Sequence, residues 1–268
     1  MNRRRFIEQL SALGAFVATP AISRSEAVSS KATEVFTFAV LNDLHHDSPE
    51  CDPWFRKVSE SVESLSPDLC VLAGDLANVG TLSSLKAVRE IFNTLSCPVY
   101  TVPGNHDCDV PRDTSLYEEV FPGRLNYHIE HKGWQFVFLD TTDGKEWQNT
   151  RISDRSLDWL EKTVPSLDKT TPTLVFSHFP ISPEIHMAPL NTKEVWKLLQ
   201  KLNVRGVFCG HFHGQHAVVR PPLVTTNICC ARPGVRGNFD GDPRKGFWLV
   251  TAQQGGESFE YVCKRIDV

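Results

Sequence analysis

An amide, an imidazole and a carboxylate occur on consecutive residues in the segment Pro103-Gly104-Asn105-His106-Asp107. The segment follows a strand-like run at 97–102, and Gly104 permits a tight turn without a steric penalty. We therefore expect the three polar side chains on a loop at a strand end, where catalytic groups are common. On its own, such a triplet is more typical of an ordinary polar turn.

Four other groups of polar residues recur in the same way, each directly after a short apolar run. They are Asp43-Leu44-His45, Gly74-Asp75-Leu76-Ala77-Asn78, Ser177-His178 and Gly210-His211-Phe212-His213. With the first segment they offer carboxylate, amide and imidazole ligands and no thiolate, a set that suits Mn, Fe, Zn or Co. The candidate ligands are Asp43, His45, Asp75, Asn105, His178, His211 and His213.

This ligand set is too large for one four-coordinate ion. It fits two ions that share a carboxylate and leave coordination positions for solvent. Two ions about 3.5–4 Å apart can hold the attacking and the leaving oxygen of an in-line displacement, and they lower the pKa of bound water towards about 7. The sequence therefore predicts a dinuclear centre of the kind that phosphate ester hydrolysis requires.

Alternating strands and helices are expected to position these residues. Apolar runs predict strands, and apolar residues at helical spacing predict helices. The expected strands are 35–41, 68–73, 98–102, 173–176 and 204–209, the expected helices are 54–65, 82–95, 153–164 and 192–202, and a hairpin is expected within 125–140. The polar groups follow these strands, and in open α/β sheets ligands bind at the carboxyl ends of the strands. Beyond residue 215 the pattern favours antiparallel strands.

The ordered motifs resemble those of the calcineurin-like metallophosphoesterase family, which are D-x-H, G-D-x-x-[D/N], G-N-H-[D/E], a lone His and G-H-x-H. The resemblance spans 43–213 and implies an α/β fold, a four-layer αββα sandwich of two mixed β-sheets flanked by helices. It also implies that His106 acts on the substrate and that Asp107 orients His106. The implied ligands are Asp43, His45 and His213 for one metal, Asn105, His178 and His211 for the other, and Asp75 as the bridge.

The function that this resemblance implies is hydrolysis of small phosphate mono- or diesters by a hydroxide that two metal ions, Mn, Fe or Zn, activate. A cyclic nucleotide phosphodiesterase is the alternative, because Gly-Asp-Leu-x-x-x-Gly at 74–80 resembles the compact branch that contains the bacterial enzymes of this kind. A non-catalytic binding module would be expected to lack a ligand or His106, and none is missing. A site whose metals are purely structural or redox-active is disfavoured, because it would not require His106.

Composition limits the other possibilities. The chain has 268 residues, of which 41% are hydrophobic, so one domain at 31–268 with one sizeable core is expected. The net charge of −4 gives no broad basic surface, so binding of a nucleic-acid backbone is not expected. Arg232 and Arg236 lie in a Gly/Pro-rich loop that is expected to be solvated, although either would suit a phosphate oxygen. His46 and His186 are further candidates for the pocket wall.

Residues 1–30 are interpreted as an export signal with a short linker. The segment Arg3-Arg4-Arg5-Phe6-Ile7 resembles the twin-arginine pattern, and the apolar segment 10–21 is too short to span a bilayer comfortably. We therefore expect a periplasmic or extracellular protein without a transmembrane span after signal removal. Eight cysteines would be able to pair in an oxidising compartment, and a disulfide between Cys51 and Cys108 is one possibility.

Overall fold

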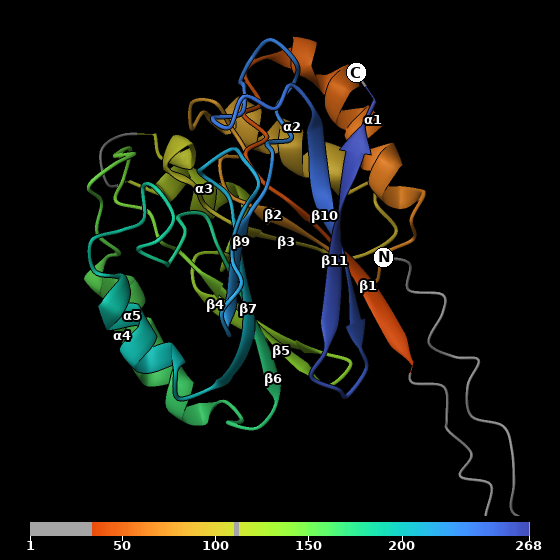
Figure 1. Ribbon diagram of the computed structural model, residues 1–268. Helices are drawn as coiled ribbons and strands as arrows, with labels where there is room; N and C mark the ends of the chain where they lie inside the picture. The colour runs from red at the N-terminus through yellow and green to blue at the C-terminus, as the bar shows by residue number, and fades with distance from the viewer. Residues whose placement is uncertain (1–33, 110–112, 268) are drawn as a thin grey trace, which may run out of the picture. The chain divides into compact units, whose positions relative to one another are not determined.

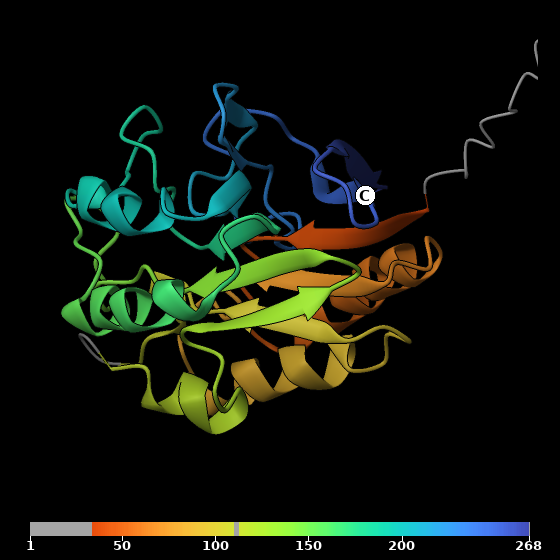
Figure 2. The ribbon, with the colours of Figure 1, turned by 90° about the horizontal axis from the view of Figure 1, so that it is seen from below.

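Two mixed β-sheets lie face to face between two layers of helices (Figures 1 and 2). The computed structural model describes residues 34–109 and 113–267. The predicted export signal at 1–30 lies outside the described residues. The arrangement is the αββα sandwich that the sequence resemblance implied, so the predicted fold class is confirmed.

The first sheet has the strand order β11-β10-β1-β2-β3. Its parallel part consists of β1 (Val35–Leu41), β2 (Leu69–Ala73) and β3 (Val99–Val102). The antiparallel strands β10 (Lys245–Gln253) and β11 (Phe259–Ile266) extend it beside β1. Because β1, β2 and β3 are parallel, the loops that follow them emerge at one edge of the sheet.

The second sheet has the order β4-β5-β6-β7-β9-β8. Its strands are β4 (Tyr127–His131), β5 (Trp134–Leu139), β6 (Pro172–Ser177), β7 (Asn203–Cys209), β8 (His216–Val218) and β9 (Leu223–Thr226). The predicted hairpin is the antiparallel pair β4 and β5. The expectation of antiparallel strands beyond residue 215 is wrong for β9, which runs parallel to β7. The chain first forms the edge strand β8 and then returns in β9, which takes the place beside β7.

Amphipathic helices cover the outer faces of both sheets. The helices are α1 (Asp52–Glu63), α2 (Leu82–Phe92) and α3 (Ser115–Val120) over the first sheet, α4 (Asp154–Thr163) and α5 (Thr192–Leu199) over the second, and the short 3-10 helices Pro49–Cys51, Asn105–Asp107 and Val164–Ser166. The side chains of Thr81 and Ser153 cap α2 and α4, where each accepts a bond from the backbone N–H three residues on.

Aromatic side chains fill the space between the two sheets. Phe176 of β6 stacks on Phe136, Phe138 and Phe208 of neighbouring strands, with ring centroids 5.7, 5.1 and 5.9 Å away. The ring of Phe38, from the first sheet, meets Phe176 edge-on at 6.0 Å. All five rings are fully buried. Close packing of these rings fixes how the strand ends of one sheet lie against those of the other.

All eight cysteines are unpaired thiols, and six of them are buried. The possible disulfide between Cys51 and Cys108 is therefore not formed. Cys51 packs in the apolar layer between the first sheet and its helices, whereas Cys108 lines a pocket. Within 34–109 and 113–267, every helix is too short or too polar to cross a membrane.

Candidate metal centre

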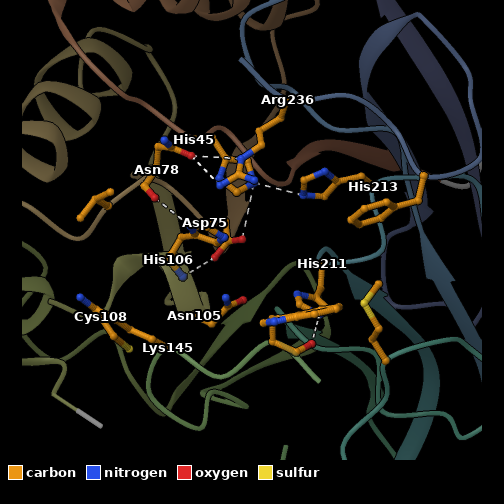
Figure 3. Close-up of a pocket in the computed structure, with 14 residues that line it drawn as sticks. His45, Asp75, Asn78, Asn105, His106, Cys108, Lys145, His211, His213 and Arg236 are labelled. Atoms are coloured by element: carbon orange, nitrogen blue, oxygen red, sulfur yellow. Dashed lines mark hydrogen bonds and ion pairs between the residues drawn. The ribbon is translucent and has the colours of Figure 1, made fainter. Parts of the chain in front are cut away.

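The seven candidate ligands lie just beyond the carboxyl ends of parallel strands. They are, in the first sheet, Asp43 and His45 after β1, Asp75 after β2 and Asn105 after β3, and in the second sheet, His178 after β6 and His211 and His213 after β7. Figure 3 shows side chains from both sheets directed into one pocket. The structure thus brings together the whole set that the sequence singled out.

The first group of ligand atoms comes from Asp43, His45, Asp75 and His213, all within 4.8 Å of one another. His213 Nε2 lies 3.1 Å from Asp43 Oδ1 and 3.1 Å from His45 Nε2. His45 Nε2 in turn lies 3.6 Å from Asp75 Oδ2. Two imidazole nitrogens at this separation require a proton or another cation between them, because two lone pairs would repel.

The second group comes from Asp75, His178 and His211, again within 4.8 Å of one another. His178 Nε2 lies 3.4 Å from Asp75 Oδ1, 3.2 Å from His211 Nδ1 and 3.3 Å from Asn105 Oδ1. Asp75 therefore presents Oδ2 to the first group and Oδ1 to the second. A carboxylate placed in this way would be able to hold one ion on each of its oxygens.

Backbone carbonyls fix which ring nitrogen of three histidines faces the site. The pairs are His178 Nδ1 with Ala73 O at 3.1 Å, His211 Nε2 with Trp147 O at 2.8 Å, and His213 Nδ1 with Gly237 O at 3.1 Å. A carbonyl oxygen only accepts, so each of these nitrogens carries a proton. The other nitrogen of each ring is then directed at the site, as in a metal-ligating histidine whose outer N–H is held by the protein.

Five of the candidate ligands have a left-handed backbone, which is uncommon for residues other than glycine. The φ angles are 55° at Asp43, 51° at His45, 52° at Asp75, 68° at His211 and 38° at His213. Such conformations cost free energy and persist where the surrounding structure enforces them. Here they bend the chain sharply at the strand ends. The two candidate ligands of the D-x-H segment, and likewise those of the H-x-H segment, therefore both face the centre although they are two residues apart.

Gly104 is required by the close approach of its loop to Asp75. A Cβ at Gly104 would overlap the backbone N and Oδ1 of Asp75. The backbone N–H of His106 donates to the same Oδ1 at 2.8 Å. The loop after β3 is therefore fastened directly to the shared carboxylate, and no residue with a side chain carbon would fit at Gly104.

The expected role of Asp107 in orienting His106 is corrected by the structure. The Asp107 carboxylate accepts from the backbone N–H groups of Ala77 and Gly104, both at 2.8 Å, because the 3-10 turn directs it inward. The His106 ring is held instead by its Nδ1, which donates to the carbonyl oxygen of Asn78 at 2.7 Å. Burial and the nearby Asp75 raise the pKa of Asp107 to about 7. Asp107 thus joins the loop after β3 to the loop after β2 through these two hydrogen bonds.

Two carboxylates and two histidines of the centre shift each other's pKa values. Burial alone would raise the pKa of both carboxylates, but His213 lowers the pKa of Asp43, and His178 lowers that of Asp75. Burial likewise opposes charge on the histidines, yet Asp75 raises the pKa of His178 to about 9, and Asp43 raises that of His213. The carboxylates therefore favour positive charge within the buried donor set, which fits a site for cations.

A pocket of about 500 Å³ opens over this centre. Its remaining wall is partly apolar and partly cationic, and includes Val79, Lys145, Trp147, Met187, Arg236 and Phe239. Trp147 is 52% exposed and Phe239 63% exposed. Sequence patterns did not mark these two aromatic residues, since each is a single exposed side chain on an irregular loop.

The remaining predicted pocket residues are only partly where the sequence analysis expected them. Arg236 lines the pocket, against the expectation of a solvated loop, whereas Arg232 does not. His46 is buried and its Nε2 contacts Asp52 Oδ1 at 2.8 Å, so it supports the start of α1. His186 is exposed and outside the pocket wall.

We expect metal binding near pH 7 to release protons, because the ligating nitrogens of His178 and His213 must each expose a lone pair. Both pKa values are raised, that of His178 to about 9, so protons compete more strongly and metal affinity falls as the pH decreases. Calorimetric titration of metal-free protein with Mn²⁺, in buffers of different ionisation enthalpy, counts these protons. The same release is expected from His216→Asn, which alters an exposed ring. Binding heats that do not depend on the buffer would contradict the prediction.

Comparison with known proteins agrees with the geometry. Residues 36–215 match the family model described as calcineurin-like phosphoesterase. A probable cyclic nucleotide phosphodiesterase of Fibrobacter succinogenes is 30% identical over 169 residues, covering 60% of this chain and 62% of that protein. A glycerophosphodiester phosphodiesterase of Enterobacter lignolyticus is 28% identical over 199 residues, covering 66% of this chain and 69% of that protein.

A solved structure shares the fold at low sequence identity. The dimetal phosphatase from Danio rerio superimposes with a TM-score of 0.62 and 16% identity, over 87% of this chain and 99% of that one. The family match spans both candidate ligand groups, from Asp43 to His213. This chain belongs to the calcineurin-like phosphoesterase family.

Proposed function

We propose that this protein is an exported, metal-dependent phosphoesterase that hydrolyses small phosphate mono- or diesters at a dinuclear centre. The observation that carries the proposal is the position of Asp75, whose two oxygens face two separate groups of ligand atoms. In this proposal Asp43, His45 and His213 hold one ion. Asn105, His178 and His211 hold the other.

Two bound divalent ions would supply an activated water and compensate the charge of the phosphoryl oxygens. The protein's own groups hold those charges in place. Asn42 Nδ2 and the backbone N–H of His211 donate to the Asp43 carboxylate, at 2.6 Å and 3.0 Å. These bonds stabilise the ionised form of Asp43 and keep its orientation fixed, so little reorganisation is needed when the substrate enters.

His106 is the group proposed to act on the substrate. Its Nδ1 carries a proton because the Asn78 carbonyl can only accept, so Nε2 is the nitrogen that gains or loses a proton. The ring lies across His45, with centroids 4.8 Å apart, and it lines the pocket. A protonated Nε2 would donate to the leaving alkoxide as the P–O bond breaks.

A cyclic nucleotide phosphodiesterase is the second candidate within this class. Trp147 and Phe239 offer exposed aromatic faces at the pocket, and stacking on such a face is worth about 1–3 kcal/mol per nucleobase. Several relatives are named as probable cyclic nucleotide phosphodiesterases. The glycerol moiety of a glycerophosphodiester, the substrate in the name of another relative, has no planar ring that could stack in this way.

The substrate class is tested by assaying the Mn²⁺-loaded protein against phosphomonoesters, alkyl phosphodiesters, 3′,5′-cyclic nucleotides and phospholipids. We expect the protein to turn over at least one of these classes. This turnover should disappear when a chelator removes the metal and return when Mn²⁺ is added back. Preference for cyclic nucleotides over glycerophosphodiesters would favour the second candidate. Absence of metal-dependent turnover on every class would contradict the proposal.

We expect His106→Ala to keep both ions and to lose about 10²–10⁴ in rate on alkyl esters. A poor alkoxide leaving group needs a proton as it departs, whereas a nitrophenolate hardly does, so the loss should be much smaller for aryl esters. Rates on matched alkyl and aryl diesters, together with metal content, measure this. His186→Ala serves as the control, since that side chain lies outside the pocket wall. Equal losses on both esters would assign His106 to charge stabilisation, and loss of metal would make it structural.

Export is proposed from the leader and is compatible with the thiols. A twin-arginine route transports folded proteins, and the eight unpaired cysteines suit a chain that folds in a reducing compartment. Replacing Arg3 and Arg4 by Lys should leave uncleaved precursor in the cytoplasm, as seen by cell fractionation and mass of the N-terminus. The control Arg5→Lys should be exported normally. Uncleaved wild-type protein in the cytoplasm of its host would show that the localisation is wrong.

A further inference from the structure

Arg236 is a cation at the pocket whose side chain is bound to a neutral partner. Its Nε and Nη2 both donate to the Asn78 side-chain oxygen, at 3.1 and 2.9 Å (Figure 3). Among residues 34–109 and 113–267 no carboxylate pairs with it. The amide aligns the guanidinium without cancelling its charge, and the other N–H donors on Nη1 and Nη2 stay available.

The backbone around Arg236 is fastened to the candidate metal centre. Its carbonyl oxygen accepts from Nζ of the buried Lys245 at 2.6 Å, and the carbonyl of the next residue, Gly237, accepts from His213 Nδ1 at 3.1 Å. Arg236 is therefore not a freely moving residue of a solvated loop. Its position is set by a candidate ligand on one side and by the first residue of β10 on the other.

Asn78 connects Arg236 to the group proposed to act on the substrate. The Asn78 carbonyl holds the His106 ring, and the Asn78 side chain holds the Arg236 guanidinium. The side chains of His106 and Arg236 are thus both held by Asn78, which lines the pocket together with Asp75. A guanidinium with free, coplanar N–H donors matches the oxygens of a phosphoryl group better than an ammonium does.

We infer that Arg236 binds a non-bridging oxygen of the phosphoryl group, and that the neutral side chain of Asn78 positions it for this contact. The inference rests on the proposed function of the same pocket. It adds a protein cation to the charge that the two ions provide. It also gives a reason for the amide at residue 78, since a carboxylate there would pair with Arg236 and weaken its attraction for an anion.

Binding of inorganic phosphate to the Mn²⁺-loaded protein, measured by calorimetry, tests this without turnover. Arg236→Ala should raise the Kd for phosphate about 10- to 100-fold, since a hydrogen bond between charged groups is lost. Arg236→Lys should recover only part of the affinity. Asn78→Asp keeps the backbone carbonyl that holds His106 and nearly the same shape, yet should weaken phosphate binding similarly. Metal content should be unchanged in all three variants.

Arg232→Ala is the matched control, because Arg232 lies in the same loop without lining the pocket, and its phosphate affinity should equal that of the parent. Unchanged affinity in both Arg236→Ala and Asn78→Asp would overturn the inference. Loss of metal from Arg236→Ala would also overturn it, because the residue would then support the centre. A protein that hydrolysed no phosphoester but showed these affinity losses would contradict the proposed function and support the role of Arg236.

Discussion

The burial of two carboxylates beside each other is the constraint on which the site depends. Asp43 and Asp75 are both almost fully buried, and each raises the energy of the other's charge. Buried charges are tolerated only when they are paired. In the protein alone the two carboxylates favour protons on His178 and His213, whose pKa values are raised for this reason. Cations that replace those protons would satisfy the same carboxylates, so the electrostatics of the pocket and the proposed metal binding have one cause.

Both sheets of the fold contribute to bringing the buried carboxylates and histidines together. Parallel strands end at one edge of each sheet, and the aromatic layer around Phe176 sets the two edges against each other. Left-handed turns at the strand ends then direct ligand side chains to a common point. The loop that carries His106 is bonded to Asp75 through its backbone. A change in the packing between the sheets would therefore alter the separation of the two ligand groups, even at a distance from the pocket.

The sequence predicted which side chains would come together, because each candidate ligand follows an apolar run, a local pattern that survives in the fold. It predicted α1 at 54–65, whereas the helix is Asp52–Glu63, since Pro53 suits the first helical turn and the start is set there. Other features depend on contacts between distant segments and have no local signature. The direction of β9, the backbone donors that hold Asp107, and the bond between Asn78 and Arg236 are of this kind. The connection of the exposed Trp147 to the site is evident only from the structure, in which its carbonyl oxygen accepts a hydrogen bond from His211.

Asp75 is the residue proposed to join two metal ions in one centre. Electron paramagnetic resonance of the protein loaded with Mn²⁺, with metal content measured on the same sample, tests this role most directly. We expect two ions per chain whose spins are coupled, with loss of the coupling in Asp75→Asn, because the side chain that faces both ligand groups would lose its charge. A single ion per chain, or two ions that give only the signal of isolated Mn²⁺, would contradict it.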